Sequence, residues 1–366
     1  PVSVISPISS WGAGIMGLVA PLLIAAELTS ISPFQAFLYM IPMNFYVITA
    51  LIMMFIVILT RFDIGPMREQ ERKAIVDGVL VDELREVPGD TDEDLPSVNN
   101  SSAQALLVPM IGLAVTVIIM MFITGGLEAG SWDLYSVLEN TMVTHSLIAG
   151  GIVGLILSLV YYFRYTKTND SFGPEKIWLG IKSGFKAMFP AMMVLTLAWM
   201  IGNLISQLGT GDVVGAMVAN SNLPVSLLLG VVFTVACIMA LATGTSWGSF
   251  GILIPVTGEI MISLGETELL LPAVAAVLAG AVFGDHCSPI SDSTILSSTG
   301  AGSNHITHVM TQLPYAVLSA SIALVGYIVL GFTSSVWLSL VTIFVLLALV
   351  VFVSKAIYKP IEKPAQ

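Results

Sequence analysis

The stretch 269-LLLPAVAAVLAGAVFGDHCSPISDSTILSS-298 joins two segments of very different composition. Up to Phe283 it consists of the apolar residues that are typical of a membrane-buried helix. From Gly284 onward it holds two aspartates, a histidine, a proline, several serines and a threonine. Polar groups are tolerated at membrane depth only where protein or a water-filled cavity surrounds them. The stretch therefore predicts a helix that is broken inside a membrane-protein bundle, with a functional site at the break.

The composition of the whole chain supports a membrane protein. Of its 366 residues, 56% are hydrophobic and only 10% are charged, and the mean hydropathy is +0.92; these values are too apolar for a soluble globular protein. The net charge of −11 does not indicate a cationic partner, because about half of the 24 acidic residues lie between Asp63 and Asp94. Cys237 and Cys287 are far apart and lack the spacing of a metal site, so we interpret them as packing residues.

Apolar runs of the roughly 20 residues needed to cross a bilayer recur along the chain. The uninterrupted runs lie at 11–29, 36–60, 105–125, 143–163, 187–207, 223–243, 313–333 and 335–354. Two further runs, 244–264 and 269–308, are interrupted, which brings the expected number of crossings to about ten. An open sheet cannot satisfy its backbone in lipid, and the strands of a barrel alternate in polarity. We therefore predict an all-α integral membrane protein, a repeat-based bundle with discontinuous helices.

The basic residues predict the orientation of the chain. All 13 lysines and arginines lie in three segments, at 61–85, 164–186 and 355–363. By the positive-inside rule these segments are cytoplasmic, and the acidic loop 126–142 between the first two lies outside. The protein is thus expected to be a multi-pass protein of the cytoplasmic membrane.

The chain divides by composition into a front part at 1–61, an acidic linker at 62–104 and a larger back part at 105–366. We interpret the linker as a short surface helix followed by a flexible acidic segment; a regulatory cation sensor is the alternative. Two motifs of the front part, 6-SPIS-9 and 10-SWG-12, recur in the back part as 288-SPIS-291 and 246-SWG-248. This echo predicts two transporter repeats, makes Ser9 and Ser10 candidate site residues, and leads us to expect that further spans precede Pro1.

The polar segment supplies the candidate ion ligands. Pro289 interrupts helix hydrogen bonding, so we expect an unwound stretch with free carbonyl oxygens beside the hydroxyls of Ser288 and Ser291. Asp285 and Asp292 are the candidate exchangeable charges, because carboxylates inside a membrane are costly and usually functional. Together these oxygens suit a small hard cation such as sodium. The alternative is that either aspartate only caps a following helix, at 293–299 in the case of Asp292.

Other polar residues could contribute to the same site. The hydroxyls of Thr245 and Ser246 open another apolar run, as expected of an unwound hinge that lines the same cavity. His286 is a candidate proton relay, and Glu259 is a candidate partner or lining residue of lower rank.

The runs 243-TGTSWGSFGILIP-255 and 278-LAGAVFGDHCSPISDSTILSSTGAGSNHITHVMTQLPYA-316 resemble the signature of the NhaC-type sodium/proton antiporter family, and 1-PVSVISPISSWGAGIMG-17 resembles its first-half motif. The resemblance implies inverted repeats with broken helices. It also implies exchange of a cation against protons or, in some relatives, against organic acids or amino acids. The site residues that it carries over are Asp285, Ser288, Ser291, Asp292, Thr294, Thr245 and Ser246.

The expected function is sodium/proton antiport without a cofactor, in which Asp285 and Asp292 bind either sodium or protons. The first alternative is an ion-coupled antiporter of a small carboxylate or amino acid, such as malate or lactate. An intramembrane enzyme is disfavoured, because the chain has no HExxH motif, no phosphate loop and no recognisable Ser–His pairing. The expected partners are membrane lipid, sodium, protons, a small organic anion or amino acid and a second copy of the chain, but no nucleic acid.

Overall fold

The computed structural model describes residues 1–7, 9–61, 63–79, 102–166, 175–186 and 224–357, together with single residues at 173, 189, 193, 200 and 361. Every regular element in these ranges is a helix, which confirms the predicted all-α class. The chain forms two compact units. Unit 1 contains Pro1–Ile5, Ile15–Asp90 and Met188–Gln366, and unit 2 contains Ser6–Gly14 and Thr91–Ala187.

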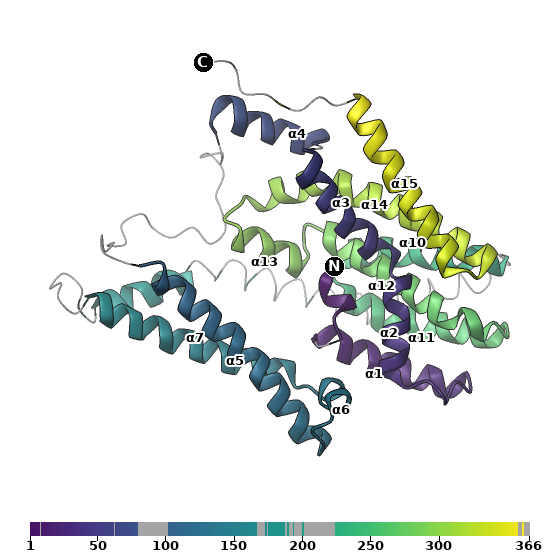
Figure 1. Cartoon of the computed structure of the whole chain (residues 1–366), viewed down its shortest axis with the longest axis horizontal. Coiled ribbons are helices and arrows are strands. Elements are labelled where there is room, and N and C mark those ends of the chain that lie inside the picture. The colour runs from purple at the N-terminus through teal and green to yellow at the C-terminus, as the bar shows by residue number, and fades with distance from the viewer. Residues whose placement is uncertain are drawn as a thin grey trace. The chain divides into compact units, whose positions relative to one another are not determined.

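Unit 2 is built around two long apolar helices, α5 (Gln104–Ala129) and α7 (Val143–Thr166), with the short α6 (Leu134–Glu139) between them in the chain. The two long helices pack along each other (Figure 1). Glycine makes this close packing possible: a Cβ added at Gly150 would lie 3.0 Å from the carbonyl oxygen of Leu113. Small residues at such contacts are typical of helices that associate within a membrane.

Unit 2 also includes helical residues at 175–186. Unit 1 contains most of the other helices. In chain order they are η1 (Val2–Ile5), α1 (Ser10–Ala25, in this unit from Ile15), α2 (Pro33–Met40), η2 (Ile41–Met43), α3 (Phe45–Thr60), α4 (Gly65–Arg72), η3 (Lys73–Asp77), α10 (Val225–Thr243), α11 (Ser246–Ser263), η4 (Thr267–Leu269), α12 (Leu270–Cys287), α13 (Asp292–Gly300), α14 (His305–Thr333) and α15 (Val336–Ile357).

Among the described residues, 7 helices are long and apolar enough to cross a membrane, and the shorter helix Gly14–Ala25 is also apolar. These helices confirm a multi-span membrane protein. The run predicted at 187–207 lies almost entirely outside the described residues. The number of about ten crossings therefore stays a prediction, as does the functional division of the chain at 62–104.

Three of the predicted runs differ from the structure at an internal break or at a proline. The run 36–60 is not one helix, because α2 ends at Met40 and α3 starts anew at Phe45, where the Asn44 side chain accepts a hydrogen bond from the Val47 amide over 3.4 Å. The run 244–264 is not interrupted, because α11 continues through Pro255. Helix α14 likewise begins upstream of the predicted run and continues through its own proline. A proline removes only one backbone donor, which a helix inside a bundle tolerates.

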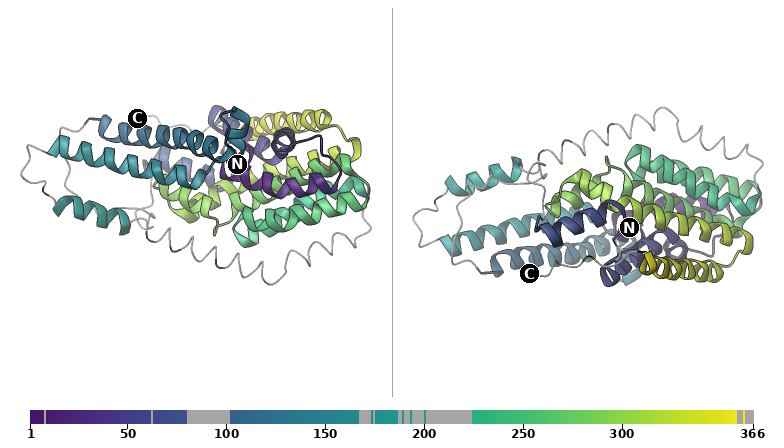
Figure 2. Two further views of the ribbon diagram at one scale, coloured as in Figure 1. Left: turned by 90° about the horizontal axis from the view of Figure 1, so that it is seen from below. Right: turned by 90° about the horizontal axis from the view of Figure 1, so that it is seen from above.

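Helix α12 is the centre of unit 1. It lies among α10, α11, α14 and α3 and contacts each of them (Figures 1 and 2). Nearly all of its residues are buried. Gly280 and Gly284, one turn apart, form the face toward α10; an added Cβ would collide there with the Phe233 carbonyl and with the Leu241 amide nitrogen. This backbone-to-backbone contact fixes the rotation of α12 and hence the directions of the side chains that follow Gly284.

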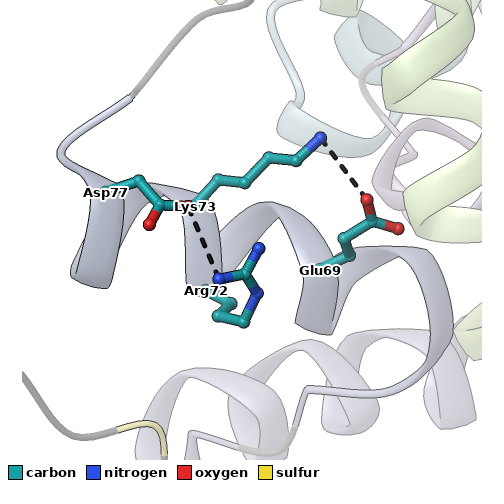
Figure 3. Close-up of polar contacts among 4 residues, drawn as sticks. All are labelled: Glu69, Arg72, Lys73 and Asp77. Carbon is teal, nitrogen blue, oxygen red and sulfur yellow. Dashed lines mark ion pairs between the residues drawn. The ribbon is translucent and has the colours of Figure 1, made fainter.

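Helix α4 and the π-helical turn η3 form the start of the linker. Two ion pairs lie on their surface, Lys73–Glu69 at 3.4 Å and Arg72–Asp77 at 3.5 Å (Figure 3). All four side chains are exposed, so each pair contributes a few tenths of a kcal/mol at most, about 0.2–0.5 kcal/mol for a spacing of four residues. The predicted acidic segment at 80–101 lies outside the described residues.

Candidate ion-binding site

Two helix junctions meet beside the end of α12. At the first, α10 ends at Thr243, its C-cap Gly244 has a left-handed backbone with φ of 70°, and Thr245 then caps α11. At the second, α12 ends at Cys287 and α13 begins at Asp292. The junctions touch closely: a Cβ at Gly244 would lie 2.9 Å from the carbonyl oxygen of Ile290. Glycine is therefore required both by the backbone angle and by the space available.

The carboxylate of Asp285 lies at this meeting point. The residue is only 3% exposed. Ser246 Oγ donates a hydrogen bond to Asp285 Oδ2 over 2.7 Å, and Ser293 Oγ donates one to Oδ1 over 2.9 Å. Ser291 Oγ also donates to Oδ1. The structure thus surrounds one buried carboxylate with three hydroxyl groups that come from three different positions near helix starts.

The starts of two helices face this carboxylate, although Asp285 itself lies in the last turn of α12, whose dipole opposes its charge. Ser246 is the first residue of α11, Ser291 is the N-cap of α13, and Ser293 lies in the first turn of α13. A helix N-terminus carries a partial positive charge that stabilises an anion. The sequence has no lysine or arginine from Ala187 to Ser354, so no such side chain of these segments can neutralise Asp285. Two helix N-termini and three hydroxyl donors stabilise its charge instead.

Four backbone carbonyls at the break already accept hydrogen bonds, contrary to the prediction of free carbonyls made from Pro289. Backbone carbonyls that leave a helix need other donors, and side chains or amides of α13, α14 and the turn supply them here. Thr294 Oγ1 lies within hydrogen-bond distance of the Asp285 carbonyl (3.4 Å) and of the His286 carbonyl (3.3 Å), and Gln312 Nε2 also donates to His286. The Ser291 amide donates to the Ser288 carbonyl over 3.2 Å. His305 Nε2 donates to the Pro289 carbonyl over 2.6 Å. The oxygens left to bind an ion here belong mainly to side chains.

The predicted residues of the break have distinct positions. Ser288 is fully buried, and its hydroxyl accepts a hydrogen bond from the Ile290 amide over 3.4 Å, so it shapes the turn. The Thr294 hydroxyl on α13 lies within hydrogen-bond distance of the carbonyls of Asp285 and His286 in the last turn of α12. Asp292 is half-buried and is the first residue of α13. The cap of this helix is Ser291, whose hydroxyl accepts from the Thr294 amide, so the interpretation of Asp292 as the cap was wrong.

The remaining back-part candidates are Thr245, Glu259 and His286. Thr245 caps α11 by accepting a hydrogen bond from the Trp247 amide over 3.3 Å. Glu259 is exposed on α11, about 20 Å along the helix from Ser246 at 1.5 Å per residue. His286 follows Asp285 but points to another neighbour: its Nδ1 lies 2.7 Å from the hydroxyl of Tyr46 on α3. It also lines a cavity of about 210 Å³ between α3, α4 and α14.

The front-part candidates belong to unit 2 and start α1. Ser9 Oγ donates to the Ser6 carbonyl over 2.8 Å and accepts from the Gly12 amide over 3.1 Å. Ser10 is the first residue of α1. Both copies of the Ser-Pro-Ile-Ser motif therefore stand directly before a helix start. The assignment of Ser9 and Ser10 to the ion site stays a prediction.

Sequence reasoning missed Ser293 as a donor to Asp285. A signal was available, because Ser293 lies two positions after Ser291, and side chains in the first turn of a helix point toward the same end. It also missed the spacing of Gly280 and Gly284, which is the small-residue pattern of close helix packing.

Comparison with known proteins extends this picture to the whole chain. Residues 2–332 match the family model described as the Na+/H+ antiporter family. The chain belongs to the Na+/H+ antiporter family. This membership confirms the resemblance seen in the motifs, and with the membrane-competent helices it makes the chain a multi-pass protein of the cell membrane.

Three relatives of this Na+/H+ antiporter family member are informative. An uncharacterized protein of Haemophilus influenzae is 40% identical over 342 residues, which are 92% of this chain and 62% of that protein. The malate-2H(+)/Na(+)-lactate antiporter of Bacillus subtilis is 29% identical over 202 residues, 54% of this chain and 40% of that protein. An uncharacterized Na(+)/H(+) antiporter of Haemophilus influenzae is 36% identical over 147 residues, 39% of this chain and 30% of that protein.

The chain therefore spans less than two thirds of the length of each of these relatives. The family and two of the relatives carry the names of transporters rather than enzymes. No solved structure matches the chain.

Proposed function

We propose that the protein exchanges sodium ions for protons across the cell membrane, and that Asp285 is the residue that binds both. The observation that carries this proposal is the buried Asp285 carboxylate, which accepts hydrogen bonds from Ser246, Ser291 and Ser293. The family membership supports the same function.

Carboxylate and hydroxyl oxygens are the hard ligands that a small hard cation prefers. Each of the three serine hydroxyls has lone pairs that can turn toward an ion when its hydrogen turns away. For Ser246 a second acceptor is already in place, because its Oγ lies 3.1 Å from the carbonyl oxygen of Ala281. Rotation of these hydroxyl groups would turn their lone pairs toward a sodium ion at the carboxylate.

Competition at one carboxylate couples the two ions. A proton on Asp285 removes the negative charge that a sodium ion needs, and a bound sodium ion repels the proton. Either ion can be carried, but not both, so movement of one in one direction drives the other in the opposite direction. The half-buried Asp292, at the start of α13, is the proposed second charge of the site.

The test is Asp285→Asn in the full-length protein, assayed in membrane vesicles by proton movement after sodium addition. The variant keeps the shape of the side chain and removes its charge, and we expect it to abolish the sodium-driven movement. Glu268→Gln is the matched control, because Glu268 is exposed and lies before the other end of α12, about 25 Å from Asp285 at 1.5 Å per residue. Exchange at the parental rate in Asp285→Asn would refute the proposal.

The second candidate is ion-coupled exchange of a small carboxylate, which the name of the Bacillus subtilis relative supports. A carboxylate substrate could bind at helix N-termini rather than at a basic side chain. Malate and lactate added in turn to the same vesicles separate the two candidates. Proton movement that requires one of these acids, and not sodium alone, would favour the carboxylate antiporter.

A further inference from the structure

Two side chains of α14 reach across to the break between α12 and α13. His305 is the first residue of α14, and Gln312 lies two helical turns later on the same face. His305 Nε2 lies 2.6 Å from the carbonyl oxygen of Pro289, and Gln312 Nε2 donates to the carbonyl oxygen of His286. The two carbonyls stand on either side of the Ser288 turn. Helix α14 therefore donates hydrogen bonds to the carbonyls before and after Ser288, where the chain changes direction.

The hydrogen-bond chemistry defines the role of the His305 ring. A carbonyl oxygen can only accept, so Nε2 carries a hydrogen and donates it to Pro289. The other ring nitrogen, Nδ1, lies 3.1 Å from the hydroxyl of Ser298, which is fully buried in α13. His305 thus connects three segments at once: the start of α14, the turn and the body of α13.

The segment that is held in this way carries two of the three hydroxyls around Asp285. Ser291 lies two positions after Pro289, whose carbonyl accepts the bond from His305, and Ser293 lies in the first turn of α13. Both serines donate to Asp285. A hydrogen bond to a carbonyl oxygen restrains the group that bears it. The bond from Gln312 to His286 is part-buried, whereas the bond from His305 to Pro289 is exposed. The positions of Ser291 and Ser293 therefore depend on α14, which itself contributes no described contact to the Asp285 carboxylate.

We propose that His305 and Gln312 are positioning residues that hold the Ser288–Ser291 turn, and through it Ser291 and Ser293, against Asp285. Any displacement of α14 then changes the geometry of the ion ligands directly. The effect on sodium transport rests on the proposed function. The claim that His305 and Gln312 hold the Ser288–Ser291 turn does not.

Hydrogen exchange in the full-length protein tests whether His305 and Gln312 hold the Ser288–Ser291 turn. His305→Ala and Gln312→Met each remove one donor, the latter with a side chain of similar length. Each should speed exchange about five- to tenfold at the amides of the peptide 286–294, as the loss of roughly 1 kcal/mol predicts. His305→Gln, whose amide can replace Nε2 as the donor, should restore most of the protection. Ile306→Ala is the control, because Ile306 is exposed beside His305. Unchanged exchange in His305→Ala and Gln312→Met would overturn the proposal.

The link to the ion is tested by sodium-dependent proton movement in the same variants. His305→Ala and Gln312→Met should raise the sodium concentration for half-maximal rate about fivefold, with a smaller change in the maximal rate. His305→Gln should lie near the parental value. Faster hydrogen exchange with an unchanged sodium requirement would overturn the positioning role. If Asp285→Asn still transports sodium, the proposed function fails, and the hydrogen-exchange result stands or falls by itself.

Discussion

The hydroxyl of Ser246 donates to the carboxylate of Asp285 over 2.7 Å, although 39 positions separate the two residues in the chain. This bond joins the first residue of α11 to the last turn of α12. It exists because α10 and α12 pack backbone to backbone, which brings the junction after α10 to the end of α12. The site is thus a product of helix packing rather than of one motif.

Ser246→Ala tests this relationship. The substitution removes one donor from a buried carboxylate and one oxygen from the proposed ion shell, so we expect about a tenfold higher sodium requirement, equivalent to about 1.4 kcal/mol. The measurement is the sodium dependence of proton movement in vesicles. Ser249→Ala is the control, because Ser249 is also buried on α11 but, within the described part of the chain, donates to the carbonyl of Thr245, the N-cap of the same helix. Equal sodium requirements in the two variants would contradict the prediction.

Ser293→Ala tests the hydroxyl that sequence reasoning missed. Loss of its 2.9 Å bond to Asp285 should raise the sodium requirement severalfold without affecting insertion into the membrane. The matched substitution is Ser297→Ala, one turn further along α13 at an exposed position. A parental sodium response in Ser293→Ala would show that its hydroxyl is not part of the ion shell.

Gly244→Ala tests the contact between the two junctions. The left-handed backbone alone costs about 1–2 kcal/mol with an alanine, and the new methyl group would also meet Ile290. We expect a lower midpoint of thermal unfolding in detergent and a weaker response to sodium. Gly251→Ala, within α11, has no neighbour in the way and should change neither value by much. Similar unfolding midpoints for both variants would mean that the junctions are not in tight contact.

Asp292→Asn compares the two proposed charges. Asp292 is half-buried at the start of α13, so its replacement should leave the unfolding midpoint nearly unchanged, whereas Asp285→Asn weakens the acceptor for three hydroxyls and should lower it. Both variants should lose sodium-driven proton movement in the vesicle assay. Parental exchange in Asp292→Asn would assign the coupling to Asp285 alone.

The sequence predicted the helical class, the family and the break near Pro289, because apolar length and a proline inside a polar motif are local signals. Local signals also gave two wrong predictions of helix continuity. The Asn44 cap divides a run that looks continuous, and α11 passes through Pro255 without a break. In both cases the outcome depends on which side chain or helix lies nearby to satisfy the backbone.

The candidate site was predicted in part for the same reason. Asp285, Ser246 and Ser291 were named from their composition and motif, and the structure brings them together. The partners of the break carbonyls, His305 and Gln312, lie on another helix, so only the folded arrangement shows that these oxygens are occupied. The position of Asp285 at the centre of the hydroxyl cluster likewise depends on the packing of α11 beside α12. No local sequence pattern predicts this packing.

The occupied carbonyls have a consequence for how this protein can change over time. An ion shell made of backbone oxygens stays the same whichever amino acids are substituted around it. Here each proposed ligand is a serine or aspartate side chain, and a single base change in the gene can replace any of them. Relatives with this architecture could therefore acquire a different cargo through one or two point mutations, without rebuilding a helix.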